Sequence, residues 1–322
     1  MTKPLVTILI PVYNGEEYLY RLLDSILIQD YSSLQVIIVN DGSTDNTEKI
    51  IHKYIELFNE KKIQNKYVKQ NNCGQSVAIR NGLNYVKGEF LTWPDSDDFY
   101  TSGKAISKLV DELISKNQNI VRCKPIFFDG IKTKYHDYKF DSDNIFYDCL
   151  YATEKFWFQP ICYMINYNKY LELNPNLDFF CEKSAGQNWQ FYLILFNSQK
   201  CITIEDRLCA IYERDESHSR LRFKKTSKII DKYSSYINTI TSTLNLIDLN
   251  ENIKKDIIER ITVQYYSMMY VEVYLVDKKS AKIFYMENRE NISISLLKRF
   301  KMSALGVFLK KIKILIFKYM DA

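Results

Sequence analysis

The chain has 322 residues, of which 46% are hydrophobic and 26% are charged, and its formal net charge is +5. These values describe a globular protein with enough residues to bury a substantial core, in one large domain or two smaller ones. The modest positive charge indicates neither a nucleic-acid-binding protein nor a disordered chain.

The first hundred residues alternate between apolar runs and amphipathic patterns. Strands are expected at 6–14, 34–39, 66–69 and 89–93. Helices are expected at 16–29, 46–58 and 75–85, the second of them capped by Asp45 or Thr44. The first two strands are continuous apolar runs, which is typical of strands buried on both faces of a parallel sheet. This half of the chain therefore predicts an α/β fold with right-handed crossovers.

The remaining residues form a less regular α/β pattern that ends in helices. A helix is expected at 103–116, a strand at 119–128 and an irregular or hairpin segment at 132–148. Further on, the pattern predicts a strand at 156–166, a loop at 178–186, a helix at 187–198 and two short strands at 201–204 and 208–212. Helical patterns follow at 229–247 and 253–276. We expect a mixed α/β domain at 1–224 and a helical C-terminal region at 225–322.

The cysteines and histidines do not form a recognisable metal motif. Seven cysteines occur singly, without a Cys-x-x-Cys pair and without a preceding secretory signal. We expect reduced thiols and a cytoplasmic location. No two of the three histidines are close enough in sequence to suggest a histidine-based metal site.

Polar side chains follow two of the expected parallel strands. Asn40-Asp41-Gly42 comes directly after the second strand, and Asp95-Ser96-Asp97-Asp98 comes after the fourth. Taken alone, the second segment is equally typical of a solvated acidic turn, since neighbouring carboxylates repel one another. Ligands of open α/β sheets bind at the carboxyl ends of the strands. The two segments together therefore predict a binding site at that edge.

Four motifs in this order resemble glycosyltransferase family 2. They are Val6–Asn14, Val39–Asp45, Gly74–Gly82 and Asp95–Asp98. The resemblance implies a GT-A fold, which is a Rossmann-like, mostly parallel sheet flanked by helices. It also implies a nucleotide-sugar donor such as a UDP-sugar, a divalent metal and inversion at the anomeric carbon. Residues 1–100 would be the nucleotide-sugar-binding half and residues 101–224 the acceptor half.

The resemblance assigns donor-binding roles to residues at the strand ends. The donor-binding set is Pro11, Val12, Tyr13, Glu17, Asp41, Arg80, Asp95, Ser96 and Asp97. Asp97 is the implied ligand of Mn²⁺ or Mg²⁺, and Asp95 faces the ribose or a metal-bound water. Tyr13 either stacks on a pyrimidine or packs at the strand end. Asp41 either accepts from the base or ribose or is a turn residue before glycine.

Two further candidate contacts with the sugar donor each have an alternative, non-functional interpretation. Arg80 either reaches the diphosphate or is a surface charge on a helix. The segment 212–219 occupies the place of a loop that closes over donor phosphates in relatives. There His218 either completes the metal shell or is an idle exposed side chain, and Arg214 or Arg220 can neutralise phosphate.

The acceptor half departs from the family pattern. Many members carry Gly-Glu-Asp before a helix, and its aspartate deprotonates the acceptor hydroxyl. Here the corresponding residues are Gly186, followed by the acceptor-binding candidates Gln187, Asn188 and Trp189. Because neither amide takes up a proton, the base candidates are Glu182, which is preferred, and Asp178.

The tail at 296–320 has a basic and an amphipathic pattern. Leu305, Phe308, Leu309, Ile312, Ile316 and Tyr319 share one helical face, and Lys310, Lys311 and Lys318 share the other. The apolar run is too short to span a membrane, so we expect a helix lying on the inner membrane face or, alternatively, packed on protein.

The sequence thus predicts an inverting, metal-dependent glycosyltransferase that acts on a saccharide acceptor, lipid-linked in cell-surface or capsular polysaccharide synthesis. Two alternatives remain. One is a non-catalytic partner subunit of a glycosyltransferase pair, suggested by Gln187-Asn188. The other is a nucleotidyltransferase, although the loop after the first strand is acidic rather than basic.

Overall fold

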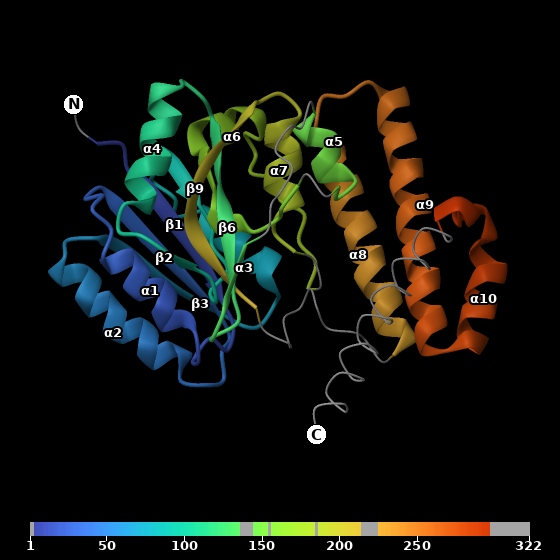
Figure 1. Cartoon of the computed structure of the whole chain (residues 1–322), viewed down its shortest axis with the longest axis horizontal. Helices are drawn as coiled ribbons and strands as arrows, with labels where there is room; N and C mark the ends of the chain where they lie inside the picture. The colour runs from blue at the N-terminus through green and yellow to red at the C-terminus, as the bar shows by residue number, and fades with distance from the viewer. Residues whose placement is uncertain (1–2, 136–143, 154–155, 184–185, 214–224, 297–322) are drawn as a thin grey trace, which may run out of the picture. The chain divides into compact units, whose positions relative to one another are not determined.

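The computed structural model describes residues 3–135, 144–153, 156–183, 186–213 and 225–296 (Figure 1). The chain divides into two compact units. One comprises Met1–Leu221 with Ser242–Asp248, and the other comprises Arg222–Thr241 with Leu249–Ala322. Each unit is described separately below.

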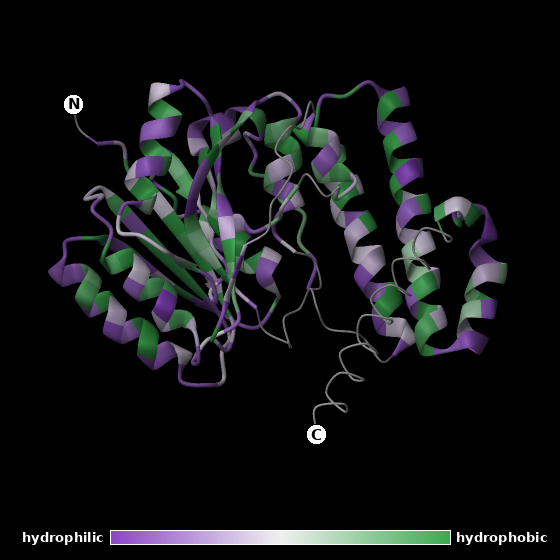
Figure 2. Ribbon diagram, in the orientation of Figure 1, coloured by the Kyte–Doolittle hydropathy of each residue, from purple (hydrophilic) through white to green (hydrophobic). Residues whose placement is uncertain are grey.

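Parallel strands form one half of the sheet in the first unit. They are β1 (Val6–Val12), β2 (Leu34–Asp41), β3 (Gln64–Gln70) and β4 (Phe90–Thr92), in the order β3-β2-β1-β4. Every residue of β1 and β2 is buried, which confirms the prediction drawn from their continuous apolar runs. These strands are also among the most hydrophobic segments of the chain (Figure 2). The core of the unit is built around them.

Helices between these strands cover the sheet. They are α1 (Leu19–Leu27), α2 (Thr47–Glu60) and α3 (Gln75–Leu83). The strand order reverses direction after β3, so right-handed crossovers place α3 on the face opposite α1 and α2. Gly82 lets α3 approach β1 closely, because a Cβ there would lie 2.2 Å from Leu9 Cδ1. The reversal between β1 and β4 creates a topological switch point at the carboxyl edge.

The other half of the sheet is mixed. It contains β5 (Phe99–Tyr100), β6 (Ile120–Phe128), β7 (Thr133–Tyr135), β8 (Tyr163–Asn166) and β9 (Cys201–Tyr212). β8 pairs antiparallel with β4 and β6, whereas β9 runs parallel to β6 and antiparallel to β5. The predicted fold class, an α/β sheet of this type followed by helices, is confirmed.

The prediction of two separate strands near the end of the sheet is wrong. The two strands expected at 201–204 and 208–212 are a single strand, β9. The register shifts opposite Cys123 and Pro125 of β6, where Cys123 pairs with Ile204 and Pro125 with Cys209. Pro125 has no backbone N–H to donate, so the residues between Ile204 and Cys209, which are three charged residues and Leu208, form a bulge rather than a loop.

One predicted strand is shorter than the pattern indicates, and one segment is predicted as irregular or a hairpin. Within 156–166 only β8 is a strand, because Pro160 starts a 3₁₀ turn, η1 (Pro160–Cys162). Within 132–148 the structure places β7 and the start of α5, and residues 136–143 lie outside the described part. The helices of this half are α4 (Ala105–Ser115), α5 (Ile145–Leu150), α6 (Tyr167–Leu173) and α7 (Trp189–Phe196).

The second unit is helical. Its elements are α8 (Thr226–Leu244, of which the last three residues belong to the first unit), α9 (Glu251–Val276), α10 (Lys278–Asn288) and η2 (Arg289–Asn291). The Tyr233 hydroxyl of α8 donates to Glu272 Oε1 of α9 at 2.6 Å. The rings of Tyr266 and Phe284 stack between α9 and α10. Within the described residues, no helix is long and apolar enough to cross a membrane.

Candidate active site

The carboxyl ends of β1, β2 and β4 meet at one edge of the sheet. Tyr13 follows β1 with 47% of its surface exposed. Asp41 ends β2 and is only 4% exposed. It directly follows Asn40, which pairs with Val12 at the end of β1. The Asp95–Asp98 turn follows β4, which pairs with β1 on its other side. The structure therefore brings these predicted residues to one edge, as expected for neighbouring parallel strands.

The loops that follow β1 and β2 are tied to each other. The Asn14 amide donates to Ser43 Oγ at 3.0 Å, and the Thr44 amide donates to Asn14 Oδ1 at 2.8 Å. Glu16 accepts from the Asn46 amide at 3.0 Å in the same way. Pro11 and Val12 are buried at the end of β1 below these loops. The paired loops hold the Tyr13 ring at the exposed edge.

Asp45 is hydrogen-bonded within these loops, whereas Glu17 is exposed. Partial burial disfavours the Asp45 carboxylate, but hydrogen bonds from Thr47 and from the Glu16 amide hold its pKa below the usual value. Asp45 thus satisfies the backbone amide of Thr47, the first residue of α2, but the N-cap residue is Asn46 rather than the predicted Asp45 or Thr44.

The Asp41 carboxylate organises the segment between β3 and α3. Its Oδ1 accepts from Gln70 Nε2 at 2.7 Å and from the Cys73 amide at 2.9 Å. Its Oδ2 accepts from the Gly74 amide at 2.9 Å. The following residue, Gly42, has φ +73°, and a Cβ there would lie 2.7 Å from a backbone nitrogen. Asp41 therefore shapes this loop, whatever contact it makes with a nucleotide.

Asp95 is held by two amide side chains from different parts of the chain. Gln75 Nε2, at the start of α3, donates to Asp95 Oδ1 at 2.6 Å. Gln187 Nε2, just before α7, donates to the same oxygen at 2.8 Å. Both donors are neutral, so they orient the carboxylate without cancelling its charge. Gln75 is a site residue that the sequence did not reveal, and it is recognisable only as the first residue of a helix that follows a strand end.

Asp97 and Asp98 have different surroundings. Asp98 is 3% exposed, and its Oδ1 accepts from the Tyr212 amide of β9 at 3.1 Å. The Asp98 amide donates to the Asp95 carbonyl, which closes the turn. Asp97 and Ser96 are only partly buried within this turn. Asp98 thus anchors the turn while Asp97 keeps solvent access.

Arg80 and Glu182 lie where the 178–183 segment meets α3. Arg80 is exposed and lies beside the Cys181 thiol. Burial raises the pKa of this thiol above its usual value, although the positive charge of Arg80 opposes the rise. Ser76 Oγ donates to the Glu182 carbonyl at 2.9 Å and accepts from the Glu182 amide at 3.2 Å. Gly74 touches the same segment, because a Cβ there would lie 2.5 Å from the Lys183 carbonyl oxygen.

These contacts distinguish the two base candidates. Ser76 follows Gln75, which binds Asp95, so the backbone of Glu182 is connected to the Asp95 side chain through two neighbouring residues of α3. Asp178 is exposed, and its backbone amide and carbonyl bind the side chain of Asn174 instead. Of the two residues, Glu182 is the one whose backbone is hydrogen-bonded to α3 next to Gln75.

The acceptor candidates at the start of α7 are mostly buried. Gln187 is 1% exposed, and Trp189 is 9% exposed with its Nε1 donating to the Cys149 carbonyl at 3.4 Å. The Trp189 ring packs edge-on against Phe158. Gln187 Oε1 and Asn188 Oδ1 are buried acceptors without a hydrogen-bond partner among the described residues. These two oxygens are suited to accept from a bound hydroxyl or to face a cation.

The oxygen ligands available in this turn fit a hard divalent metal ion. Carboxylate oxygens of Asp95 and Asp97 lie in one turn, and the unpartnered Gln187 oxygen belongs to the residue that binds Asp95. Mg²⁺ and Mn²⁺ prefer such oxygen ligands together with phosphate and water. His218, Arg214 and Arg220, predicted to assist from the 212–219 segment, lie outside the described residues.

Comparison with known proteins agrees with this arrangement. Residues 7–202 match the family model of glycosyl transferase family 2. Glycosyltransferase GlyA of Streptococcus pneumoniae is 32% identical over 158 residues, which cover 47% of this chain and 22% of that protein. An uncharacterized glycosyltransferase of Rickettsia typhi is 42% identical over 102 residues, which cover 32% of this chain and 30% of that protein. The alignments thus span less than a third of either relative.

Solved structures share the fold at low sequence identity. The crystal structure of Staphylococcus aureus TarS 1-349 in complex with UDP-GlcNAc has a TM-score of 0.64 and 19% identity, covering 84% of this chain and 75% of that one. The mannosyltransferase PcManGT from Pyrobaculum calidifontis, in complex with GDP-Man and Mn²⁺, has a TM-score of 0.56 and 17% identity, covering 96% and 81%. Because the family model alone covers more than half of the chain, this protein belongs to glycosyl transferase family 2.

Proposed function

We propose that this protein transfers a sugar from a nucleotide-sugar donor, with UDP-sugars the favoured class, to a hydroxyl of a saccharide acceptor with inversion. The observation that carries the proposal is the Asp95–Asp98 turn at the switch point between β1 and β4, beside the end of β2. Family membership supports the reaction class. It also disfavours the nucleotidyltransferase alternative.

The donor half has the residues that a nucleoside diphosphate requires. The exposed Tyr13 ring offers a flat apolar face to a pyrimidine. Asp97 and Asp95 would hold Mn²⁺ or Mg²⁺, which would act as a Lewis acid on the departing diphosphate. Arg80, in the last turn of α3, carries an exposed guanidinium beside Cys181, and its planar fork matches phosphate oxygens.

The acceptor half supplies the proton acceptor and the orienting groups. We assign the base to Glu182, which takes the proton of the acceptor hydroxyl as that oxygen attacks opposite the diphosphate. The buried Gln187 and Asn188 oxygens accept from other hydroxyls of the saccharide and orient it. Trp189 supports this region mainly from the core, since its ring packs on Phe158.

Replacing Glu182 by glutamine should lower kcat by about 10²- to 10⁴-fold, because the amide cannot accept the proton. The matched control is Asp178→Asn, which removes a carboxylate of the same segment and should leave kcat within a few-fold. Steady-state kinetics of both variants at saturating donor check the assignment. A large loss in Asp178→Asn with normal turnover in Glu182→Gln would reverse it.

A second candidate function is a non-catalytic partner subunit. The observation that favours it is the pair of amides, Gln187 and Asn188, where many relatives carry carboxylates. Gln187 donates to Asp95 and so preserves the donor side even without a base. A chain that binds donor but never releases nucleoside diphosphate, alone or with acceptor, would support this candidate.

Donor binding tests the proposed function. The full chain is titrated by calorimetry and thermal shift with UDP, several UDP-sugars and GDP-mannose, each with Mn²⁺ and with a chelator. We expect at least one UDP-sugar to raise the melting temperature in the presence of Mn²⁺, since a ligand at 100 times its Kd stabilises the folded state by about 2.7 kcal/mol. No shift with any nucleotide sugar would contradict the proposal.

We further propose that the acceptor is a lipid-linked saccharide of cell-surface or capsular polysaccharide synthesis, reached from the cytoplasmic face of the membrane. The support is the sequence of the tail, in which Lys310, Lys311 and Lys318 share a helical face opposite an apolar one. The tail lies outside the described residues. A lysine near an anionic surface contributes about 1 kcal/mol to binding.

Removing the residues after Leu296 should lower binding to anionic phosphatidylglycerol vesicles by at least about tenfold, as measured by co-sedimentation. A full chain with Lys310, Lys311 and Lys318 changed to glutamine keeps its apolar face and should show a similar loss of binding to the anionic vesicles. Neutral phosphatidylcholine vesicles are the control. Undiminished binding of the truncated chain would mean that the tail is not the membrane contact.

A further inference from the structure

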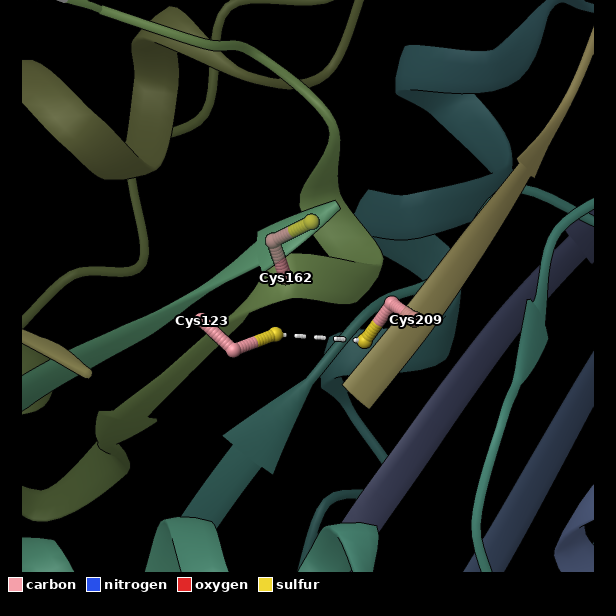
Figure 3. A group of neighbouring side chains, drawn as sticks. All are labelled: Cys123, Cys162 and Cys209. Atoms are coloured by element: carbon pink, nitrogen blue, oxygen red, sulfur yellow. Dashed lines mark hydrogen bonds between the residues drawn. The ribbon is translucent and has the colours of Figure 1, made fainter. Parts of the chain in front are cut away.

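Three cysteine thiols meet inside the first unit. They are Cys123 of β6, Cys162 of η1 and Cys209 of β9. Each residue is fully buried. The three sulfur atoms lie within 4.8 Å of one another, and Cys123 Sγ is 3.4 Å from Cys209 Sγ (Figure 3). The cluster joins segments that are far apart in sequence.

The bulge between β6 and β9 brings these thiols together. Cys209 pairs with Pro125 after the register shift, which places it near Cys123, two residues earlier on β6. The 3₁₀ turn that starts at Pro160 carries Cys162 to the same place. Cys209 Sγ also donates to the Ile161 carbonyl at 3.1 Å, so a backbone oxygen faces the cluster.

The spacing suits coordination of one ion better than a disulfide. At 3.4 Å the Cys123 and Cys209 sulfurs are well beyond the bond length of about 2.05 Å. Zinc binds thiolate sulfur at about 2.3 Å, so two sulfurs on one tetrahedral ion are about 3.8 Å apart. The Cys123–Cys209 separation is slightly shorter than that value, and the other two pairs lie within 4.8 Å. Three thiols converging on one buried point are a ligand set for soft and borderline ions.

We propose that Cys123, Cys162 and Cys209 form a buried three-thiolate site for a d¹⁰ ion of the Zn²⁺ class. Each thiol that coordinates the ion releases its proton to solvent. The Ile161 carbonyl oxygen, 3.1 Å from Cys209 Sγ, is a candidate for the fourth contact. Thiolates prefer soft ions and carboxylates prefer hard ones, so this site and the Asp95–Asp97 turn select different metals.

A bound ion would stabilise the strands that hold the carboxylate turn. Cys209 pairs with Tyr100 of β5, the strand directly after Asp95–Asp98. Tyr212, three residues beyond Cys209 on β9, donates its amide to Asp98. Cross-linking β6, η1 and β9 through one ion would therefore restrict movement of the turn. Metal at the cluster would act on stability rather than on the reacting atoms.

The experiment uses the reduced full chain with Cd²⁺ as the spectroscopic probe. Because the cluster is fully buried, Cd²⁺ is added both to the native protein and during refolding from denaturant. We expect an ultraviolet thiolate-to-cadmium charge-transfer band that saturates at one ion per chain, and zinc in protein purified from zinc-supplemented cells. Cys123→Ser, Cys162→Ser and Cys209→Ser should each weaken Cd²⁺ binding by about a hundredfold.

Two controls keep the result specific. Cys149 is equally buried but outside the cluster, so Cys149→Ser should bind Cd²⁺ normally. Asp97→Ala should also bind it normally, and excess Mn²⁺ should not displace it. The proposal is overturned if the wild-type chain shows no band under either loading condition, or if the band survives in all three cluster variants. A Cys123–Cys209 disulfide in protein that binds no Cd²⁺ would overturn it as well.

Discussion

Replacing Asp97 by alanine should lower the turnover of donor and acceptor by about 10³-fold in the presence of Mn²⁺. That factor corresponds to roughly 4 kcal/mol of transition-state stabilisation, within the range that a metal ion contributes at a developing negative charge. Asp97 lies in the turn after β4 and is only partly buried, which leaves it accessible to the cation of the proposed donor site. Initial rates at saturating donor measure the effect.

The folded state should survive the Asp97 substitution. Asp98, which accepts from the Tyr212 amide of β9, is kept in this variant, so the melting temperature should change by no more than a few degrees. Asp111→Ala, on the exposed side of α4, is the control for loss of an aspartate and should have normal turnover. Normal turnover in Asp97→Ala would exclude this residue as a metal ligand.

Replacing Asp41 by alanine should destabilise the first unit by about 3 kcal/mol or more. The substitution removes the charged acceptor of three part-buried hydrogen bonds, from Gln70 Nε2 and from the amides of Cys73 and Gly74, and each of these bonds contributes about 1 kcal/mol or more. Asp41→Asn keeps one acceptor oxygen and should cost less. Urea unfolding followed by circular dichroism measures the free energy of unfolding.

The Asp41 result separates a structural role from a nucleotide contact. If Asp41 mainly holds the 70–74 segment, loss of donor affinity should accompany loss of stability in both variants. Ser43→Ala, at the neighbouring loop, removes one hydrogen bond to the Asn14 amide and should cost about 1 kcal/mol. An Asp41→Ala protein with wild-type stability and no donor binding would show that the side chain serves the nucleotide alone.

The parallel half of the sheet could be predicted because its signals are local. Continuous apolar runs identify β1 and β2, and the polar residues that follow them mark the carboxyl edge. Parallel pairing then places Tyr13, Asp41 and Asp97 together without knowledge of any side-chain contact. The long β9 was not predictable in the same way, because its bulge depends on Pro125 in a partner strand far away in sequence.

Side-chain partners from distant segments could not be derived from the sequence. The hydrogen bonds from Gln75 and Gln187 to Asp95 join α3 to the residue before α7, and nothing in either amide's local sequence identifies the other. The same holds for Cys123, Cys162 and Cys209, which show no motif spacing. Trp189 is a residue type that is more often core than acceptor platform, and its burial and its packing on Phe158 agree with the core interpretation.

The most direct test of the account is release of nucleoside diphosphate from a nucleotide sugar by the purified full chain. The donor selected by thermal shift is incubated with saccharide acceptors, with Mn²⁺ or with a chelator, and released nucleoside diphosphate is measured by a coupled assay. The account predicts metal-dependent release that rises with acceptor and disappears in Asp97→Ala. Release that persists in the chelator and in Asp97→Ala would contradict it.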